Sequence, residues 1–204
     1  MTSALHLKQT QRILATLITI QGALLWLMFS GAPSRLPSYL GFAPGPHGTL
    51  FAWILATVTV VAYVGSASTI PAVRRWLFRL DRLKLLAVIA ATMAGVLEEV
   101  IFRKLLMDAL AERGFGPVTQ VIASALAFGF AHAVWGLKSR AAGVNAVAST
   151  TILGAALASV YLAGDRSLAP CVVAHILITA LIEPGLILAA VADRIGLWKE
   201  KPPL

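Results

Sequence analysis

Six long apolar stretches, separated by short polar segments, dominate the hydropathy pattern of the chain. A transmembrane helix needs about 20 mostly apolar residues to cross a hydrocarbon core about 30 Å thick. Because each stretch is long enough, the pattern predicts an all-α, polytopic transmembrane helical bundle that forms a single integral membrane domain over residues 1–204. The predicted spans, within a few residues at each end, are 13–31, 49–70, 85–111, 118–137, 141–163 and 168–192.

Three segments need separate interpretation. The apolar run of the first span is longer than a signal-peptide core, so we expect it to be retained as an anchor. Segment 31–48 is rich in proline and glycine, which predicts an external loop. The basic segment 74–84 fits either an amphipathic helix on anionic headgroups or a solvated loop, and the sequence leaves both open.

Composition agrees with a membrane protein. Hydrophobic residues make up 58% of the chain and charged residues 13%, against about 45–50% and about 25% in soluble domains. A net charge of +8 would suggest nucleic-acid binding in a soluble protein. Here the basic residues lie between apolar stretches, so the charge predicts membrane topology and no nucleic-acid partner.

The basic residues fall mainly on one side of the predicted membrane. If the N-terminus is cytoplasmic, the cytoplasmic segments hold Lys8, Arg12, Arg74, Arg75, Arg79, Arg82, Lys84, Lys138, Arg140, Arg194, Lys199 and Lys201. The opposite side receives Arg35, Arg113 and Arg166. Because short cytoplasmic loops carry the excess of Lys and Arg, we predict a multi-pass protein of the cell (inner) membrane with both termini cytoplasmic.

Ionisable residues inside the predicted spans are the candidates for function. Such residues are costly in a bilayer and mark function by default. Glu98, Glu99 and Arg103 lie in the third span, His132 in the fourth and His175 in the sixth. A single membrane histidine is more often an interhelical hydrogen-bonding group, but a set on three spans favours function.

Helical spacing separates these residues by role. Glu99 and Arg103 are four residues apart, so they share a helix face and are expected to form a structural pair. Glu98 is rotated by about 100° from that face and has no partner within its own helix, which suits a general base. Its expected partners are His132 and His175. Thr179 lies one turn beyond His175, where its hydroxyl can donate a hydrogen bond.

A break in the sixth span would bring these groups to similar depths. At about 1.5 Å per residue, one straight helix over 168–192 would put His175 far deeper than His132. An interior proline breaks or kinks a helix. We therefore predict a break at Pro184-Gly185, followed by a short helix over 186–196. Glu183 would either extend the polar face or cap the helix that ends before Pro184.

The polar residues form motifs that resemble those of a known family. Glu98-Glu99-x-x-x-Arg103, then Phe128-x-x-x-His132, then His175 on an apolar helix are similar to the motifs of the CPBP (Abi, or CAAX-protease-like) intramembrane endopeptidases. The matched region runs from about residue 95 to 183. The resemblance implies a glutamic-type hydrolase whose catalytic core covers about 85–192.

The resemblance also implies a mechanism without a metal or other cofactor. Glu98 would activate a water, and His132 would hold that water and relay protons. His175 and Thr179, which stands where the family usually has Asn or Asp, would stabilise the oxyanion. Glu99, Arg103 and Phe128 would support the site. The implied partners are membrane lipid and a polypeptide substrate that is membrane-bound or lipid-anchored.

Three alternatives use the same residues. Glu98, His132 and His175 would make a His₂Glu zinc set with an open position. Against it, the sequence shows no carboxylate for the second shell of either histidine, because Glu99 is assigned to Arg103. The second alternative is a non-catalytic membrane scaffold or immunity-type protein that has the same fold. The third is a transporter or channel in which the carboxylate and the histidines relay protons, although the sequence shows no inverted repeat.

Overall fold

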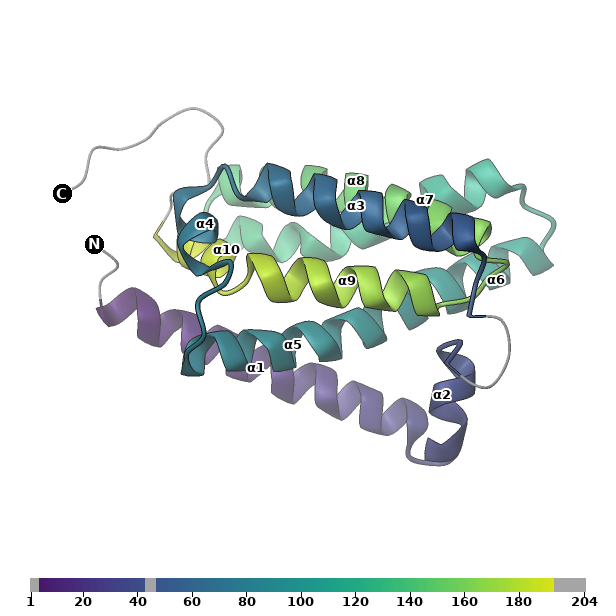
Figure 1. Ribbon diagram of the computed structural model, residues 1–204, viewed down its shortest axis with the longest axis horizontal. Helices are drawn as coiled ribbons and strands as arrows, with labels where there is room; N and C mark the ends of the chain where they lie inside the picture. Colours follow the sequence, from purple (N-terminus) through teal and green to yellow (C-terminus); the bar gives the residue numbers. More distant parts are fainter. Residues whose placement is uncertain (1–3, 43–46, 193–204) are drawn as a thin grey trace.

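The computed structural model describes residues 4–42 and 47–192, and the regular structure in these ranges is entirely helical. Among the described residues, five helices are long and apolar enough to cross a membrane, and a bent pair of helices makes a sixth candidate span. The prediction of an all-α, multi-pass membrane bundle is confirmed (Figure 1).

The chain alternates long helices with short helical segments. The long helices and their continuations are α1 (Ala4–Phe29), α3 (Leu50–Ala67), α5 (Arg82–Glu99), α6 (Leu106–Glu112), α7 (Pro117–Ala131), α8 (Arg140–Ala163), α9 (Ala169–Ile182) and α10 (Gly185–Val191). The short segments are the 3₁₀ helices η1 (Pro33–Arg35) and η3 (His132–Leu137), the π helix η2 (Val100–Leu105), and the α-helices α2 (Leu36–Tyr39) and α4 (Pro71–Trp76).

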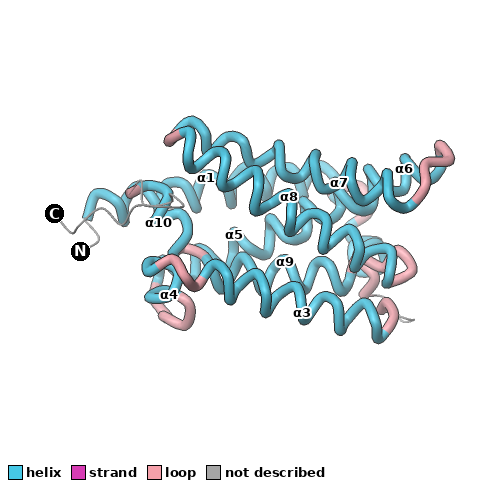
Figure 2. Tube along the Cα trace, turned by 90° about the horizontal axis from the view of Figure 1, so that it is seen from above, coloured by secondary structure: helices cyan, strands magenta, loops and turns pink. Residues whose placement is uncertain are grey.

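Helix α9 is the most enclosed of the long helices. It packs against α5 and α3, while α1 covers α5 and α7 packs along α8 (Figures 1 and 2). Its buried side chains include Val172, His175 and Ile178. Helix α1, in contrast, has few buried residues and exposes apolar side chains along most of its length. The bundle therefore has a polar group on its central helix and a lipid-compatible outer surface.

Glycine sets the close approach of α5 and α9. A Cβ atom on Gly95 would lie 2.5 Å from Ile176 Cγ1 and 3.2 Å from the backbone nitrogen of Ile176. Small residues allow the backbones of transmembrane helices to come this close. The contact lies one turn before Glu98 and Glu99, so Gly95 fixes the distance between those carboxylates and α9.

The predicted break in the sixth span is confirmed. Helix α9 ends at Ile182, α10 begins at Gly185, and the two axes are bent by 55°. The second helix starts one residue earlier than predicted, and residues 193–196 of the predicted segment lie outside the described residues.

Two other spans differ from the continuous helices that were predicted. The third extends over Arg82–Glu112 but contains the π-helical η2. The fourth is α-helical only to Ala131 and continues as the 3₁₀ helix η3. The hydrophobic pattern gives the length of a span, but it does not report how tightly the backbone winds within it.

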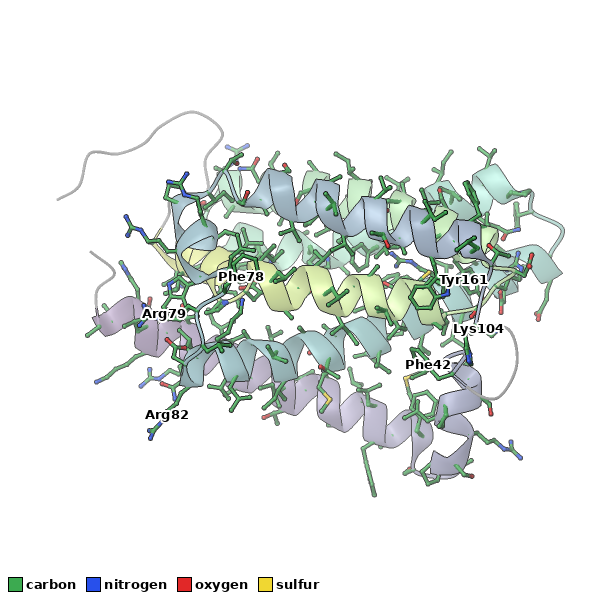
Figure 3. The ribbon with its side chains drawn as sticks, in the orientation of Figure 1. Phe42, Phe78, Arg79, Arg82, Lys104 and Tyr161 are labelled. Carbon is green, nitrogen blue, oxygen red and sulfur yellow. The ribbon has the colours of Figure 1, made fainter. Side chains whose placement is uncertain are left out.

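The basic segment 74–84 matches neither expectation over its whole length. Helix α4 ends at Trp76, and its Val73 is buried against α10, where Gly185 allows close contact. Arg79 and Arg82 lie at this end of the bundle, together with the first turn of α1, and Lys104 lies toward the other end (Figure 3). The cytoplasmic assignment of this end stays a prediction, and Arg194, Lys199 and Lys201 lie outside the described residues.

Candidate active site

The C-terminal turn of α5 and the π helix η2 carry the three charged residues predicted for the third span. Glu99 and Arg103 have fully buried side chains, and Arg103 Nε lies 3.0 Å from Glu99 Oε2. The predicted ion pair is therefore present. The remaining guanidinium nitrogens of Arg103 find no hydrogen-bond partner within the described residues. Its Cζ lies 4.8 Å from the centre of the Phe128 ring, so the cation is held between a carboxylate and an aromatic face.

The π helix begins directly after Glu99. Single π turns inside α-helices are rare and often occur at functional sites. Apolar periodicity did not reveal this segment, because one additional residue in a turn hardly changes a short hydrophobic pattern. The π turn lies between Glu99 and the polar residues of α6, so it controls how those two groups face the bundle.

His175 on α9 joins the pair of Glu99 and Arg103. The imidazole Nδ1 of His175 lies 2.7 Å from Glu99 Oε1. An ionised carboxylate only accepts hydrogen bonds, so Nδ1 carries the proton and donates it. The sequence-based assignment of Glu99 to Arg103 alone was wrong, because the two oxygens of one carboxylate serve both partners. His175 therefore does have a second-shell carboxylate, which the sequence did not reveal.

Glu98 faces the other nitrogen of the same imidazole. Its Oε2 lies 3.7 Å from His175 Nε2 and has no hydrogen-bond partner within the described residues. The distance is too long for a direct hydrogen bond. The Glu98 side chain is 19% exposed, whereas that of Glu99 is fully buried. Glu98 thus has no partner on its own helix, as helical spacing predicted, and His175 lies between the two glutamates.

His132 reaches this group through Phe128. The histidine stands at the C-terminal end of α7, where its Nδ1 lies 2.9 Å from the carbonyl oxygen of Phe128. The Phe128 ring packs edge-on against both histidines, with centroid distances of 4.9 Å to His132 and 5.7 Å to His175. No ion pair joins His132 to Glu98 in the part of the chain that the structure describes. The Phe128 ring therefore sets the spacing of the two imidazoles.

Thr179 lies one helical turn beyond His175 and is half-buried. Its carbonyl oxygen accepts a hydrogen bond from the backbone nitrogen of Glu183 at 2.9 Å, which closes the last turn of α9. The structure thus keeps Thr179 on the same helix as His175, at the spacing that was predicted.

Glu183 is the C-cap residue of α9, so the expected cap at the end of the helix before Pro184 is confirmed. Its Oε2 accepts a hydrogen bond from the backbone nitrogen of Ile187 at 3.1 Å, so it caps the first turn of α10. Lys84 also caps the end of α9, because its Nζ donates to the carbonyl oxygens of Leu181 at 2.9 Å and Glu183 at 2.7 Å. Sequence reasoning counted Lys84 only as a topological charge, and the buried cap was missed.

The zinc alternative, with Glu98, His132 and His175 as ligands, stays a prediction. Among the described residues, no group of three or more His, Cys, Asp or Glu side chains converges as metal ligands do. Glu98, His132 and His175 do not form a ready coordination sphere.

Comparison with protein families bears on the same part of the chain. The family model of the type II CAAX prenyl endopeptidases, Rce1-like, matches residues 81–181. The match covers just under half of the chain. The matched residues run from the N-cap of α5 almost to the end of α9. They include every residue of the candidate site. No curated protein and no solved structure matches the chain.

Proposed function

We propose that the protein is an intramembrane endopeptidase that hydrolyses a peptide bond in a membrane-bound or lipid-anchored polypeptide. The observation that carries the proposal is the Glu98 carboxylate oxygen. It is buried without a hydrogen-bond partner in the described part of the chain and faces an imidazole nitrogen at 3.7 Å. A positioned base of this kind can take a proton from water within a low-dielectric site.

The proposed reaction uses no metal ion. In the proposal the attacking water binds at Glu98 Oε2, which lies 3.7 Å from His175 Nε2 and makes no direct hydrogen bond to it. Glu98 takes a proton from this water. At the same time the water oxygen forms a bond to the peptide carbonyl carbon. The carbonyl oxygen becomes an oxyanion. Transfer of the proton to the leaving nitrogen then accompanies cleavage of the carbon–nitrogen bond, with His132 relaying protons.

His175 and Thr179 stabilise the oxyanion in this mechanism. The hydrogen bond from Nδ1 to Glu99 orients the ring and leaves Nε2 as the nitrogen that acts on the substrate. In the proposed mechanism the Nε2–H group of His175 donates a hydrogen bond to the oxyanion. Glu99, Arg103 and Phe128 act as positioning residues, because they touch the imidazoles rather than the substrate.

The proposal is tested by comparing membrane and secreted peptides by mass spectrometry. The samples are cells carrying the wild type, a deletion, Glu98→Gln and Glu112→Gln. Glu98→Gln preserves shape and hydrogen bonding but removes the base. Glu112 ends α6 in an exposed position and provides the matched control. We expect Glu98→Gln and the deletion to accumulate the same uncleaved precursor, at a normal protein level, while Glu112→Gln processes it.

Two outcomes would redirect the assignment. If the deletion changes the peptides and Glu98→Gln behaves as the wild type, the peptidase proposal is wrong and the non-catalytic scaffold takes its place. If the purified protein cleaves that precursor and a chelator abolishes the cleavage, with zinc restoring it, the metal-free mechanism is wrong while the peptidase activity stands.

A further inference from the structure

A second polar site lies at the end of the bundle away from α4 and α10. It is a pocket of about 670 Å³ between the segment after α1, the π helix η2 and the turn that follows α8. Three cationic side chains line it, namely those of Arg35, Lys104 and Arg166. Ser38 and Tyr39 add hydroxyl groups to the wall. None of these residues belongs to the site built around Glu98.

The charges in and behind this pocket do not cancel. Arg166 Nη1 lies 2.5 Å from Asp108 Oδ1, and Lys104 Nζ lies 3.0 Å from Asp108 Oδ2, so one carboxylate is shared by two cations. Asp165 also lines the pocket. Arg35 is exposed and has no ion-pair partner within the described residues. Three cations against two carboxylates leave one positive charge in excess.

The backbone around the pocket is built to hold this arrangement. Asp165 and Arg166 adopt positive φ angles of 52° and 62°, a left-handed conformation that non-glycine residues take at a cost. This turn aims the Arg166 guanidinium at both Asp108 and the side-chain oxygen of Gln120, which lies 2.7 Å from Nη2. Arg166 is therefore fixed from two helices before any ligand arrives.

The surface beside the pocket is apolar and faces outward. Trp26 and Leu27, near the end of α1, are each 73% exposed and lie nine and eight residues before Arg35 in the chain. In a helix that crosses a membrane, such side chains contact lipid tails. A ligand at this place would have a polar part in the pocket and an apolar part on the bundle surface.

We propose that the pocket binds the phosphodiester headgroup of an anionic phospholipid. One excess positive charge matches the single negative charge of a headgroup such as phosphatidylglycerol. Arginine and lysine are the side chains that bind phosphate oxygens, and basic pockets between transmembrane helices bind lipid headgroups. The acyl chains lie on the apolar surface at the end of α1. The inference does not depend on peptidase activity.

The test uses the full chain purified in detergent and native mass spectrometry with equal concentrations of phosphatidylglycerol and phosphatidylcholine. We expect the wild type to retain phosphatidylglycerol in preference to phosphatidylcholine. Arg35→Gln should weaken phosphatidylglycerol binding about fivefold, since each cation near a lipid headgroup contributes about that factor. Arg113→Gln is the matched control, because Arg113 is exposed near the same end and does not line the pocket.

Three results would overturn the proposal. The first is equal retention of the two lipids by the wild type. The second is an equal loss of phosphatidylglycerol binding in Arg35→Gln and Arg113→Gln, which would mean that the lipid is held by general charge attraction. The third is displacement of the lipid by glycerol 1-phosphate at comparable concentration, which would assign the pocket to a soluble phosphate ester. Because Arg35 has no ion pair to lose among the described residues, an unchanged melting temperature is expected for Arg35→Gln.

Discussion

The close approach of α5 and α9 at Gly95 makes a sharp prediction for Gly95→Ala. A Cβ atom there would lie 2.5 Å from Ile176 Cγ1 and 3.2 Å from the Ile176 backbone nitrogen. Carbon atoms in ordinary contact are about 3.5–4.0 Å apart. The two helices must therefore separate by about 1 Å. That shift would lengthen the 2.7 Å contact between Glu99 Oε1 and His175 Nδ1 beyond hydrogen-bonding distance.

The expected effects on stability and on activity differ in size. Overpacking costs about 1–3 kcal/mol, and replacing glycine by alanine inside a helix returns about 1 kcal/mol. The net loss of stability is therefore about 2 kcal/mol or less. Misplacing a catalytic group by about 1 Å can lower the rate about 100-fold. We expect Gly95→Ala to accumulate as a folded protein with strongly reduced cleavage.

The assay measures precursor cleavage together with the amount of folded protein. Gly65→Ala is the matched control, since Gly65 lies in α3 with no atom within 4 Å of an added Cβ. It should gain a little stability and retain full activity. Ile176→Ala in the Gly95→Ala background removes the side chain that obstructs the new methyl group, so part of the activity should return.

Either of two results would refute this reasoning. If Gly95→Ala cleaves as fast as the wild type, the helix separation does not control the site. If Gly95→Ala is inactive and Ile176→Ala restores nothing, the defect does not come from the contact with Ile176.

Three further substitutions follow from the same contacts. Glu99→Gln removes the charged partner of His175. It should lower the unfolding free energy in detergent by about 3–5 kcal/mol, the range for breaking a buried ion pair. A loss below about 1 kcal/mol would contradict the buried contact. Lys84→Met removes the charged cap from the carbonyl of Glu183 and should lower the melting temperature, and Lys84→Arg should lower it less. Equal melting temperatures for Lys84→Met and the wild type would contradict a stabilising cap. Phe128→Leu removes the ring that separates the two histidines and should reduce kcat more than KM; a change in KM alone would show that the ring contacts substrate instead.

Local features of the sequence predicted much of the bundle. The apolar lengths gave the spans, because the thickness of a bilayer fixes how long a crossing helix must be. The break at Pro184 and the pair of Glu99 and Arg103 also depend only on nearby residues, a proline in one case and a four-residue spacing in the other. Each was visible without knowing which helices are neighbours.

Contacts between distant helices could not be predicted in the same way. The bond from His175 to Glu99 depends on the approach of α5 and α9. The cap that Lys84 provides depends on where α9 ends in space, and a lysine near a predicted membrane boundary is equally consistent with a topological role. In both cases the residue type was informative, but the partner came from the packing.

The π helix η2 sets the rotational phase between two polar centres. It separates Glu99 from Asp108, which holds the basic residues of the second pocket. A π turn contains roughly one more residue than an α turn, so a one-residue deletion within 100–105 would rewind it and leave the phase between α5 and α6 nearly unchanged, whereas one additional α-helical residue would rotate α6 by about 100°. Asp108 would then face away from Arg166, while Glu99 would keep its place. Insertion of one residue would thus uncouple the two centres without altering either set of side chains.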